Sequence, residues 1–201
     1  MKHFPILITS LLLAACSVDY QNTSGAAYLA AGEVNDPELS RAAAYESNLH
    51  FPARIGMVKL VYNQITTTPN AERVVFADSL SRVPGEVVLL SALEALMSNS
   101  RNHYRFSQNR IRQLAASRHL DYVLIISYDP SRNTAEALFM DVRTGYPYAS
   151  AETAAQGRGP TSFWGGPLRN QNRINTATLR LARALVPEIE EMLKGLVARA
   201  R

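Results

Sequence analysis

The side chains best suited to nucleophilic or metal chemistry are few in this 201-residue chain: one cysteine, Cys16, and four histidines. An enzyme holds such groups beside partners at characteristic spacings. The sequence contains no His-x-x-x-His, Gly-x-Ser-x-Gly, Gly-x-x-x-x-Gly-Lys or paired-cysteine motif. Asp121 and Asp129 flank one apolar run and lie too far apart along it to work as a catalytic pair. The sequence therefore predicts a protein without catalytic activity, metal or cofactor.

Cys16 has a different chemical use, which its position indicates. Residues 1–15 combine a cationic tip with a short apolar run from Phe4, the layout of a secretory signal peptide. The run is too short for a membrane span, which needs about 20 residues. Its end, Leu13-Ala14-Ala15-Cys16, resembles the lipobox of bacterial lipoproteins. The resemblance implies cleavage before Cys16 and attachment of lipid to its sulfur; an ordinary signal peptide with an incidental cysteine is the alternative.

The residue after the cysteine bears on location. The residue after Cys16 is Ser17. In similar lipoproteins an Asp at this position favours retention in the inner membrane, and another residue there implies the outer membrane. We therefore expect a chain anchored by lipid to the outer membrane and facing the periplasm, where nucleic acid is not a partner. Because Cys16 is the only cysteine, no intramolecular disulfide can form, and packing alone must hold the fold together.

The remaining chain divides into a tether and one domain. Residues 16–50 are small, polar and rich in alanine, with Gly25, Gly32 and Pro37 as interruptions, which is typical of a flexible tether. A docking motif at 23–28 is the alternative interpretation of part of it. Residues 51–201 carry regular apolar patterns over a length that suits one domain.

Hydrophobic periodicity predicts the elements of this domain. Apolar runs predict strands at 53–62, 87–90, 120–128, 135–142 and 146–156. Helical spacing predicts helices at 67–83, 107–119 and from 175 onward, with shorter turns of helix at 36–46 and 91–97. Early strand–helix units that lead into an antiparallel hairpin predict a mixed α/β sheet of about five strands with helices packed on it.

Some details of the helices can be compared directly with a structure. Thr67 or Thr68 is expected to cap the first helix, and its core face is expected to hold Val75, Ala77, Leu80 and Val83. The core stripe of the last helix is expected to hold Leu179, Ala182, Leu185, Val186, Ile189, Leu193 and Leu196. Pro187 should kink or restart that helix, because its ring clashes with the carbonyl of the preceding turn.

Two motifs resemble a group of bacterial envelope lipoproteins whose fold is like the amino-terminal domain of TolB. They are Leu120-Asp121-Tyr122-Val123-Leu124-Ile125-Ile126 and the hairpin Asp141-Val142-Arg143-Thr144-Gly145. The group includes the curli-secretion lipoprotein CsgG and the penicillin-binding-protein activator LpoB. The chain is also similar to the rhombotarget lipoproteins in its length and its Val-Leu-Ile-Ile-Ser-Tyr-Asp strand. The resemblance covers residues 51–200 and implies the fold; the segment 129–135 is too short for the membrane-inserting segments of a secretion pore.

A basic segment runs from Arg101 to His119 with five arginines and no acidic residue. Such a segment suits phosphate or carboxylate groups of lipid headgroups, lipopolysaccharide or an acidic protein surface. The candidate binding residues are Arg101, Arg105, Arg110 and Arg112, the last two expected to face outward from a helix. A solvated helix face is the alternative interpretation.

A second candidate is the loop 157–167, rich in glycine and proline, which carries Phe163 and Trp164. Exposed aromatic side chains on a positioned loop often anchor a partner. The alternative is that Trp164 folds back onto the core, since tryptophan is usually largely buried.

These observations favour a non-catalytic envelope lipoprotein, an adaptor, activator or assembly factor that binds another periplasmic or outer-membrane protein. The alternative is an oligomeric export component like the curli-secretion lipoprotein. A ligand-binding or enzymatic domain is a third hypothesis, which a deep pocket with gathered polar side chains would favour.

The lipidation site is directly testable. In Cys16→Ser, the hydroxyl cannot take the place of the sulfur, so the protein should accumulate unprocessed or leave the outer-membrane fraction. Membrane fractionation with labelled palmitate measures both effects. Partitioning of this variant like the unchanged protein would contradict the lipoprotein interpretation.

Overall fold

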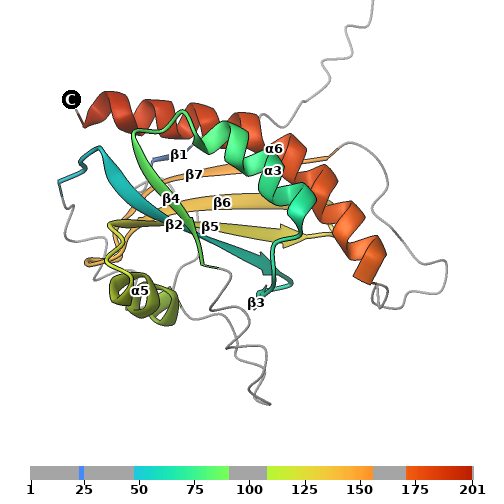
Figure 1. The fold of residues 1–201 in the computed structure, drawn as a ribbon. Coiled ribbons are helices and arrows are strands. Elements are labelled where there is room, and N and C mark those ends of the chain that lie inside the picture. Colours follow the sequence, from blue (N-terminus) through green and yellow to red (C-terminus); the bar gives the residue numbers. More distant parts are fainter. Residues whose placement is uncertain (1–22, 25–47, 91–107, 156–170, 201) are drawn as a thin grey trace, which may run out of the picture.

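The computed structural model describes residues 23–24, 48–90, 108–155 and 171–200. Figure 1 shows a twisted sheet with helices on both of its faces. In chain order the elements are β1 (Thr23–Ser24), β2 (Ala53–Val61), β3 (Gln64–Ile65), α3 (Asn70–Leu80), β4 (Gly85–Leu89), α5 (Gln108–Ser117), β5 (Tyr122–Asp129), β6 (Thr134–Asp141), β7 (Pro147–Ala154) and α6 (Gln171–Arg199). The short helices expected at 36–46 and 91–97 and the loop 157–167 lie outside the described residues.

The sheet is mixed, as the sequence predicted. Strand β2 pairs in parallel with β4 on one side and with β5 on the other. Strands β5, β6, β7 and β1 then follow one another in antiparallel pairs. The two-residue β3 pairs with the end of β2, which gives a seven-stranded sheet in which β1 and β3 are short additions to the five predicted strands.

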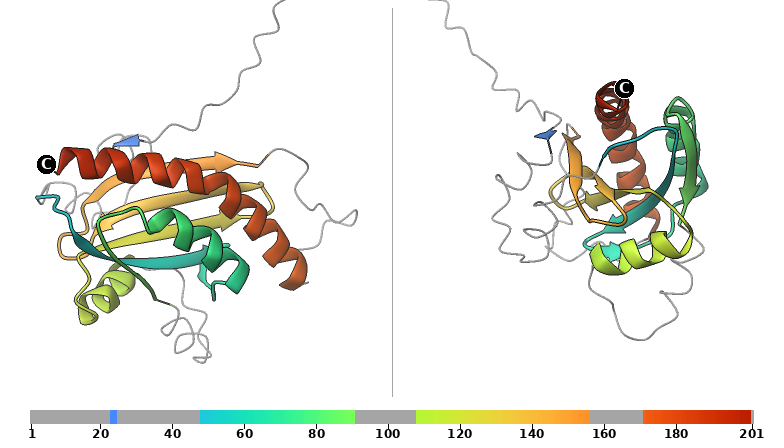
Figure 2. Two further views of the ribbon diagram at one scale, coloured as in Figure 1. Left: turned by 45° about the horizontal axis from the view of Figure 1, so that its top comes forward. Right: turned by 90° about the vertical axis from the view of Figure 1, so that its left-hand side faces the viewer.

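The helices cover the two faces of the sheet unequally. Helices α3 and α6 lie together on one face, and α5 lies on the other (Figure 2). Successive side chains of a strand point to opposite faces. On β5, Leu124 and Ile126 therefore pack toward α6, while Val123 and Ile125 belong to the cluster that includes Ile111 of α5. Burial on both faces explains the continuous apolar run of β5.

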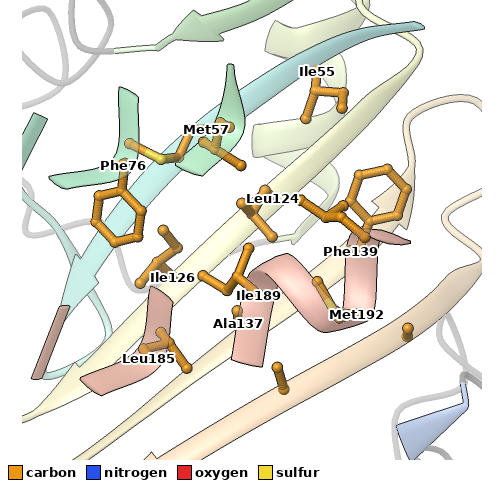
Figure 3. Packing of buried hydrophobic residues seen from close by; sticks show 14 of the residues in the cluster. Ile55, Met57, Phe76, Leu124, Ile126, Ala137, Phe139, Leu185, Ile189 and Met192 are labelled. Atoms are coloured by element: carbon orange, nitrogen blue, oxygen red, sulfur yellow. The ribbon is translucent and has the colours of Figure 1, made fainter. Parts of the chain in front are cut away.

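The larger core lies between the sheet, α3 and α6. Figure 3 shows it with Ile55 and Met57 from β2, Leu124 and Ile126 from β5, Ala137 and Phe139 from β6, Phe76 from α3, and Leu185, Ile189 and Met192 from α6. Side chains from five elements thus meet in one cluster, and with no disulfide available this burial is the main stabilising term.

Helix α3 differs from its predicted cap and face. Its N-cap is Pro69, and no side chain bonds the free backbone N–H groups, so the expected cap by Thr67 or Thr68 is wrong. Phe76 is buried whereas Ala77 is exposed. The larger apolar surface of Phe76 gains more from burial than a methyl group does, and it sets which face of the helix turns inward.

Helix α6 runs unbroken from Gln171 to Arg199 with Pro187 inside it, and its ribbon bends partway along (Figure 1). Pro187 has no N–H group for the carbonyl of Arg183, and both residues lie on the exposed side of the helix. The predicted stripe is confirmed for Ala182, Leu185, Ile189, Leu193 and Leu196, all of which are buried. Leu179 is only half-buried, and Leu181 and Met192 join the core instead.

A buried ion pair crosses this core. Lys59 of β2 donates a hydrogen bond of 2.8 Å to Oε1 of Glu72 on α3, and both side chains are almost fully buried. The Lys59 ammonium also donates to Oγ1 of Thr178 on α6 at 3.2 Å, and the Thr178 hydroxyl donates to the same Glu72 oxygen. The ammonium lies 5.3 Å from the ring centre of Tyr128. One charge thus ties both helices to the sheet.

Two polar atoms of this buried cluster, one on Tyr128 and one on Glu72, lack a hydrogen-bond partner in the part of the chain that the structure describes. They are the Tyr128 hydroxyl and Glu72 Oε2. Burial, and then the neighbouring Glu72 carboxylate, raise the pKa of Tyr128 well above its usual value. The cluster is closed off from solvent, so its role is to position α3 and α6.

Removing one partner of this pair should be far more harmful than removing both. Glu72→Leu leaves the Lys59 charge uncompensated in the core and should lower the free energy of unfolding by about 3–5 kcal/mol. The double variant Lys59→Met, Glu72→Leu has no buried charge and should recover most of that loss. Urea denaturation measures both. Equal losses in the two variants would show that the pairing does not matter.

Candidate functional site

Of the binding residues expected from the sequence, the structure describes the side chain of Arg112. Cys16, Arg101, Arg105, Phe163 and Trp164 lie outside the described residues. Arg110 belongs to α5, but its side chain is not among those described.

Arg112 does not face outward as the sequence suggested. It is half-buried, and its Nε donates a hydrogen bond of 2.9 Å to the carbonyl of Val142. Its two terminal nitrogens donate to the carbonyl of Arg143 at 2.5 Å and to Oδ1 of Asn109 at 3.1 Å. These carbonyls belong to the turn after β6. The guanidinium therefore fastens α5 to the β6–β7 hairpin.

The hydrogen bonds and backbone conformation of the β6–β7 hairpin explain the Asp-Val-x-Thr-Gly motif at 141–145. Oδ1 of Asp141 accepts hydrogen bonds from the backbone N–H of Thr144 at 2.6 Å and from the Thr144 hydroxyl at 3.0 Å. Gly145 then adopts a φ of +79°, which confirms the turn predicted there. A Cβ on Gly145 would lie 2.9 Å from the guanidinium carbon of Arg112. The Asp-Val-x-Thr-Gly motif thus has a structural cause at each of these positions.

A second polar cluster holds the chain where it enters the domain. The backbone N–H of His50 donates to the Tyr122 hydroxyl at 2.9 Å, and that hydroxyl lies 3.0 Å from Nδ1 of His50. Nε2 of His50 is 3.9 Å from Oδ1 of Asp121, whose other oxygen accepts from the backbone N–H of Arg54 at 2.8 Å. Phe51 stacks beside the same tyrosine ring.

This His–Tyr–Asp arrangement has the residue types of a proton relay. Tyr122 is fully buried, however, and burial is the main reason why its pKa is raised. The Tyr122 hydroxyl is thus closed to a substrate, and its contacts with the backbone and ring of His50 hold the two elements together. The cluster therefore anchors the start of the domain to β5.

A wide hollow lies where β2 and β5 end and β6 begins. Its volume is about 440 Å³, and we call it the acidic hollow. The residues that line it are Tyr62, Asn63, Ser127, Tyr128, Asp129, Arg132, Thr134, Ala135, Glu136, Glu152 and Thr153. In open α/β sheets, ligands commonly bind beyond the carboxyl ends of parallel strands, and β2 and β5 are such a pair.

The turns that border the hollow are tightly built. Tyr62 and Asn63 both have positive φ, at 51° and 59°, in the turn from β2 to β3. Across the hollow, Oδ1 of Asp129 accepts hydrogen bonds from the N–H groups of Ser131 and Arg132 at 3.0 and 3.2 Å. Burial acts to raise the pKa of Asp129, but the hydrogen bonds from Ser131 and Arg132 outweigh it, so the pKa lies below its usual value.

The hollow is acidic because of its strand register. Ser127 lies opposite Glu136 on β6, and Glu136 lies opposite Glu152 on β7. Residues directly opposite one another point to the same side of a sheet, and two like charges there repel. Arg132 brings one positive charge, which lies 3.6 Å from Asp129. A basic side chain would complement the charge of these two carboxylates.

Sequence reasoning missed this site. Glu136 and Glu152 are the acidic residues inside the predicted strands 135–142 and 146–156, apart from Asp141 of the hairpin, and a charge inside a strand was the available signal. Their convergence depends on pairing between three strands, which periodicity alone does not give. Within the described ranges, no three His, Cys, Asp or Glu side chains are grouped to hold a metal ion. None of the helices described is both long and apolar enough to cross a membrane.

No protein-family model and no curated protein matches the chain. Several solved structures are similar in part. The LpoB C-terminal domain from Salmonella enterica has 16% identity and a TM-score of 0.40, over 60% of this chain and 94% of that one. A PelC dodecamer from Paraburkholderia phytofirmans has 16% identity and a TM-score of 0.37, over 67% and 86%. Lipoprotein GNA1162 from Neisseria meningitidis has 19% identity and a TM-score of 0.37, over 57% and 87%.

LpoB, to which the sequence motifs bear a resemblance, is therefore among the similar structures. With TM-scores below 0.5 and identities below 20%, these similarities assign neither a family nor a function to the chain. The function has to be inferred from its own residues.

The hairpin offers a test with a matched control. Gly145→Val should lower the free energy of unfolding by about 1 kcal/mol or more, because a branched side chain is strained at this φ and meets the Arg112 guanidinium. Gly195→Ala, in the open on α6, should instead raise it by up to about 1 kcal/mol. Urea denaturation of Arg112→Ala with and without Gly145→Val separates backbone strain from the clash. An unchanged midpoint for Gly145→Val would contradict the turn geometry.

Proposed function

We propose that this chain is a non-catalytic lipoprotein, anchored to the outer membrane through Cys16. Its periplasmic domain, residues 51–201, binds another envelope protein as an adaptor, activator or assembly factor. Residues 16–50 connect the anchor to the domain. The partner carries lysine or arginine side chains that enter the acidic hollow.

The observation that carries the proposal is the acidic hollow itself. It is wide and lies at the end of the sheet, where turns and strand ends from distant parts of the chain meet. Glu136 and Glu152 face the same side there, and a protein surface with basic side chains complements that charge. A hollow lined largely by polar and charged side chains suits a protein partner better than a small substrate, which usually binds in a more apolar pocket.

The other polar clusters support binding over catalysis. Lys59 with Glu72 ties two helices to the sheet, and Tyr122 with His50 fixes the start of the domain. Arg112 holds the hairpin. Each of these groups is engaged in positioning an element of the fold.

The hollow can be tested with isosteric changes. In the full lipidated protein, Glu136→Gln with Glu152→Gln removes both charges and keeps the side-chain shape. A photo-crosslinker at Thr134, which lines the hollow and lies two residues before Glu136 on the same face of β6, should capture a partner in intact cells. The double variant should reduce the captured amount at least tenfold. Glu191→Gln, on the exposed side of α6, is the matched control and should leave capture unchanged. Thermal melting checks that both variants fold.

Three outcomes would count against this function. Equal capture by the double variant would show that the hollow is not the binding surface. The absence of any crosslinked protein would remove the support for an adaptor. A large closed ring of this chain alone, seen by size measurement of the detergent-solubilised protein, would instead favour an oligomeric export component.

A further inference from the structure

A second hollow lies between the end of α3 and the part of α6 that follows Pro187. Its volume is about 300 Å³, and we call it the α3–α6 groove. Its lining comes from Ser79 of α3, from the loop 82–84 and from positions of α6 between 190 and 198. Figure 1 shows this loop beside the part of α6 that follows the bend. The groove shares no lining residue with the acidic hollow.

The lining of the groove is largely apolar. Its apolar side chains are those of Val83, Pro84, Leu193, Val197 and Ala198. Leu193 is buried in the core, whereas Val83 and Val197 are only half-buried and Pro84 and Ala198 are exposed. Removing this remaining apolar surface from water favours a partner with apolar side chains. A volume at the lower end of the range for ligand pockets suits a few side chains better than a long acyl chain.

The loop that forms one wall of the groove is held firmly. The backbone N–H of Ala53 donates to the carbonyl of Pro84 at 3.2 Å, and that of Val83 donates to the carbonyl of Leu80 at 3.1 Å. Gly85 follows with a φ of +130°, and a Cβ there would clash with the carbonyl oxygen of Ala53. The other wall belongs to α6, which packs on the core. The groove is therefore preformed, so binding in it has little ordering cost.

The rim of the groove carries an excess positive charge. Arg82 of the loop donates a hydrogen bond of 3.4 Å to Oε2 of Glu190 on α6. Lys194 lies one helical turn after Glu190 and is exposed. In the part of the chain that the structure describes, no carboxylate forms an ion pair with Lys194. One cation at the rim thus awaits an anionic group.

The arrangement of these charges fits a peptide carboxylate better than a lipid phosphate. Arg82 already has a partner, and the carboxylate of that partner, Glu190, would repel a phosphate group placed between the two cations. An acidic peptide supplies what each part of the groove lacks. Its Asp or Glu side chain pairs with Lys194, its apolar side chain covers the floor, and its backbone N–H groups can donate to Glu190.

We propose that the α3–α6 groove binds a short acidic segment of a protein. An apolar side chain of the segment enters the groove, and a neighbouring carboxylate pairs with Lys194. This is a second interaction surface, which goes beyond the function inferred from the acidic hollow and does not depend on it. The groove selects acidic segments, whereas the hollow selects basic side chains.

The probe is a capped peptide, Gly-Asp-Leu-Asp-Leu-Asp-Gly. One control peptide has Lys in place of each Asp, and another has Ser in place of each Leu. Each is titrated into the isotope-labelled full chain in a non-ionic detergent, and the amide NMR signals are followed. The acidic peptide should shift the amides of Arg82, Val83 and residues 190–198, and its affinity should fall as salt is added. Neither control should shift these amides at the same concentration.

Variants of the rim should change binding of the acidic peptide in opposite directions. Lys194→Glu should weaken it at least tenfold, because repulsion replaces attraction. Arg173→Glu, an equal charge reversal at an exposed position of the same helix, is the matched control and should leave it unchanged. Glu190→Gln should strengthen binding at least threefold, since it removes the one carboxylate among the described residues that line the groove and releases Arg82.

The apolar floor is tested separately with Val197→Thr, which keeps the shape of the side chain but places a hydroxyl in the groove. This variant should weaken binding of the acidic peptide severalfold. Thermal melting checks that all four variants keep their fold.

Three results would overturn the proposal. They are the absence of any response to the acidic peptide, equal binding of the peptide by Lys194→Glu and the unchanged protein, and a response of the same amides to anionic phospholipid vesicles but not to the peptide. The last result would assign the groove to lipid. Glu136→Gln with Glu152→Gln should leave peptide binding unchanged, so the failure of either proposal leaves the other standing.

Discussion

The fold depends on one buried charge. Lys59 points from β2 into an otherwise apolar core, where an ammonium is tolerated only with partners around it. Glu72, Thr178 and the ring of Tyr128 supply them from α3, α6 and β5. An apolar core could accept either helix in several rotations. The Lys59 ammonium favours one rotation of each helix, because in every other arrangement the charge would be buried without a partner.

The remaining polar contacts follow a common pattern, since they lie where elements meet. Arg54 donates hydrogen bonds to the carbonyls of Arg118 and His119, which follow α5, and to the carboxylate of Glu86 on β4. Arg180 of α6 donates to Asn133 in the turn between β5 and β6. Cationic side chains thus satisfy backbone and side-chain acceptors at the sheet's ends. The acidic hollow departs from this pattern, because there the register brings carboxylates together. A departure from local consistency is where a functional surface is expected.

The sequence predicted what depends on local signals. The continuous apolar run of β5 showed that both faces of that strand are buried, and Asp141 with Gly145 showed the hairpin. It missed what depends on distant partners. The pair of Glu72 with Lys59 was not predicted, because Lys59 lies 13 residues earlier on another element. Arg112 looked solvated because the carbonyl that it binds lies 30 residues later. The carboxylates of the acidic hollow come together through the pairing of three strands, which no single segment encodes.

The attachment of β1 to the sheet sets a length scale. If Cys16 carries the lipid, the chain from it to Thr23 spans at most about 25 Å. With β1 paired, the domain is therefore confined to the immediate neighbourhood of the bilayer. Once β1 detaches, the connection runs from Cys16 to Asn48 and can extend to roughly 110 Å. The pairing of β1 with β7 would thereby decide how deep into the periplasm the domain can travel.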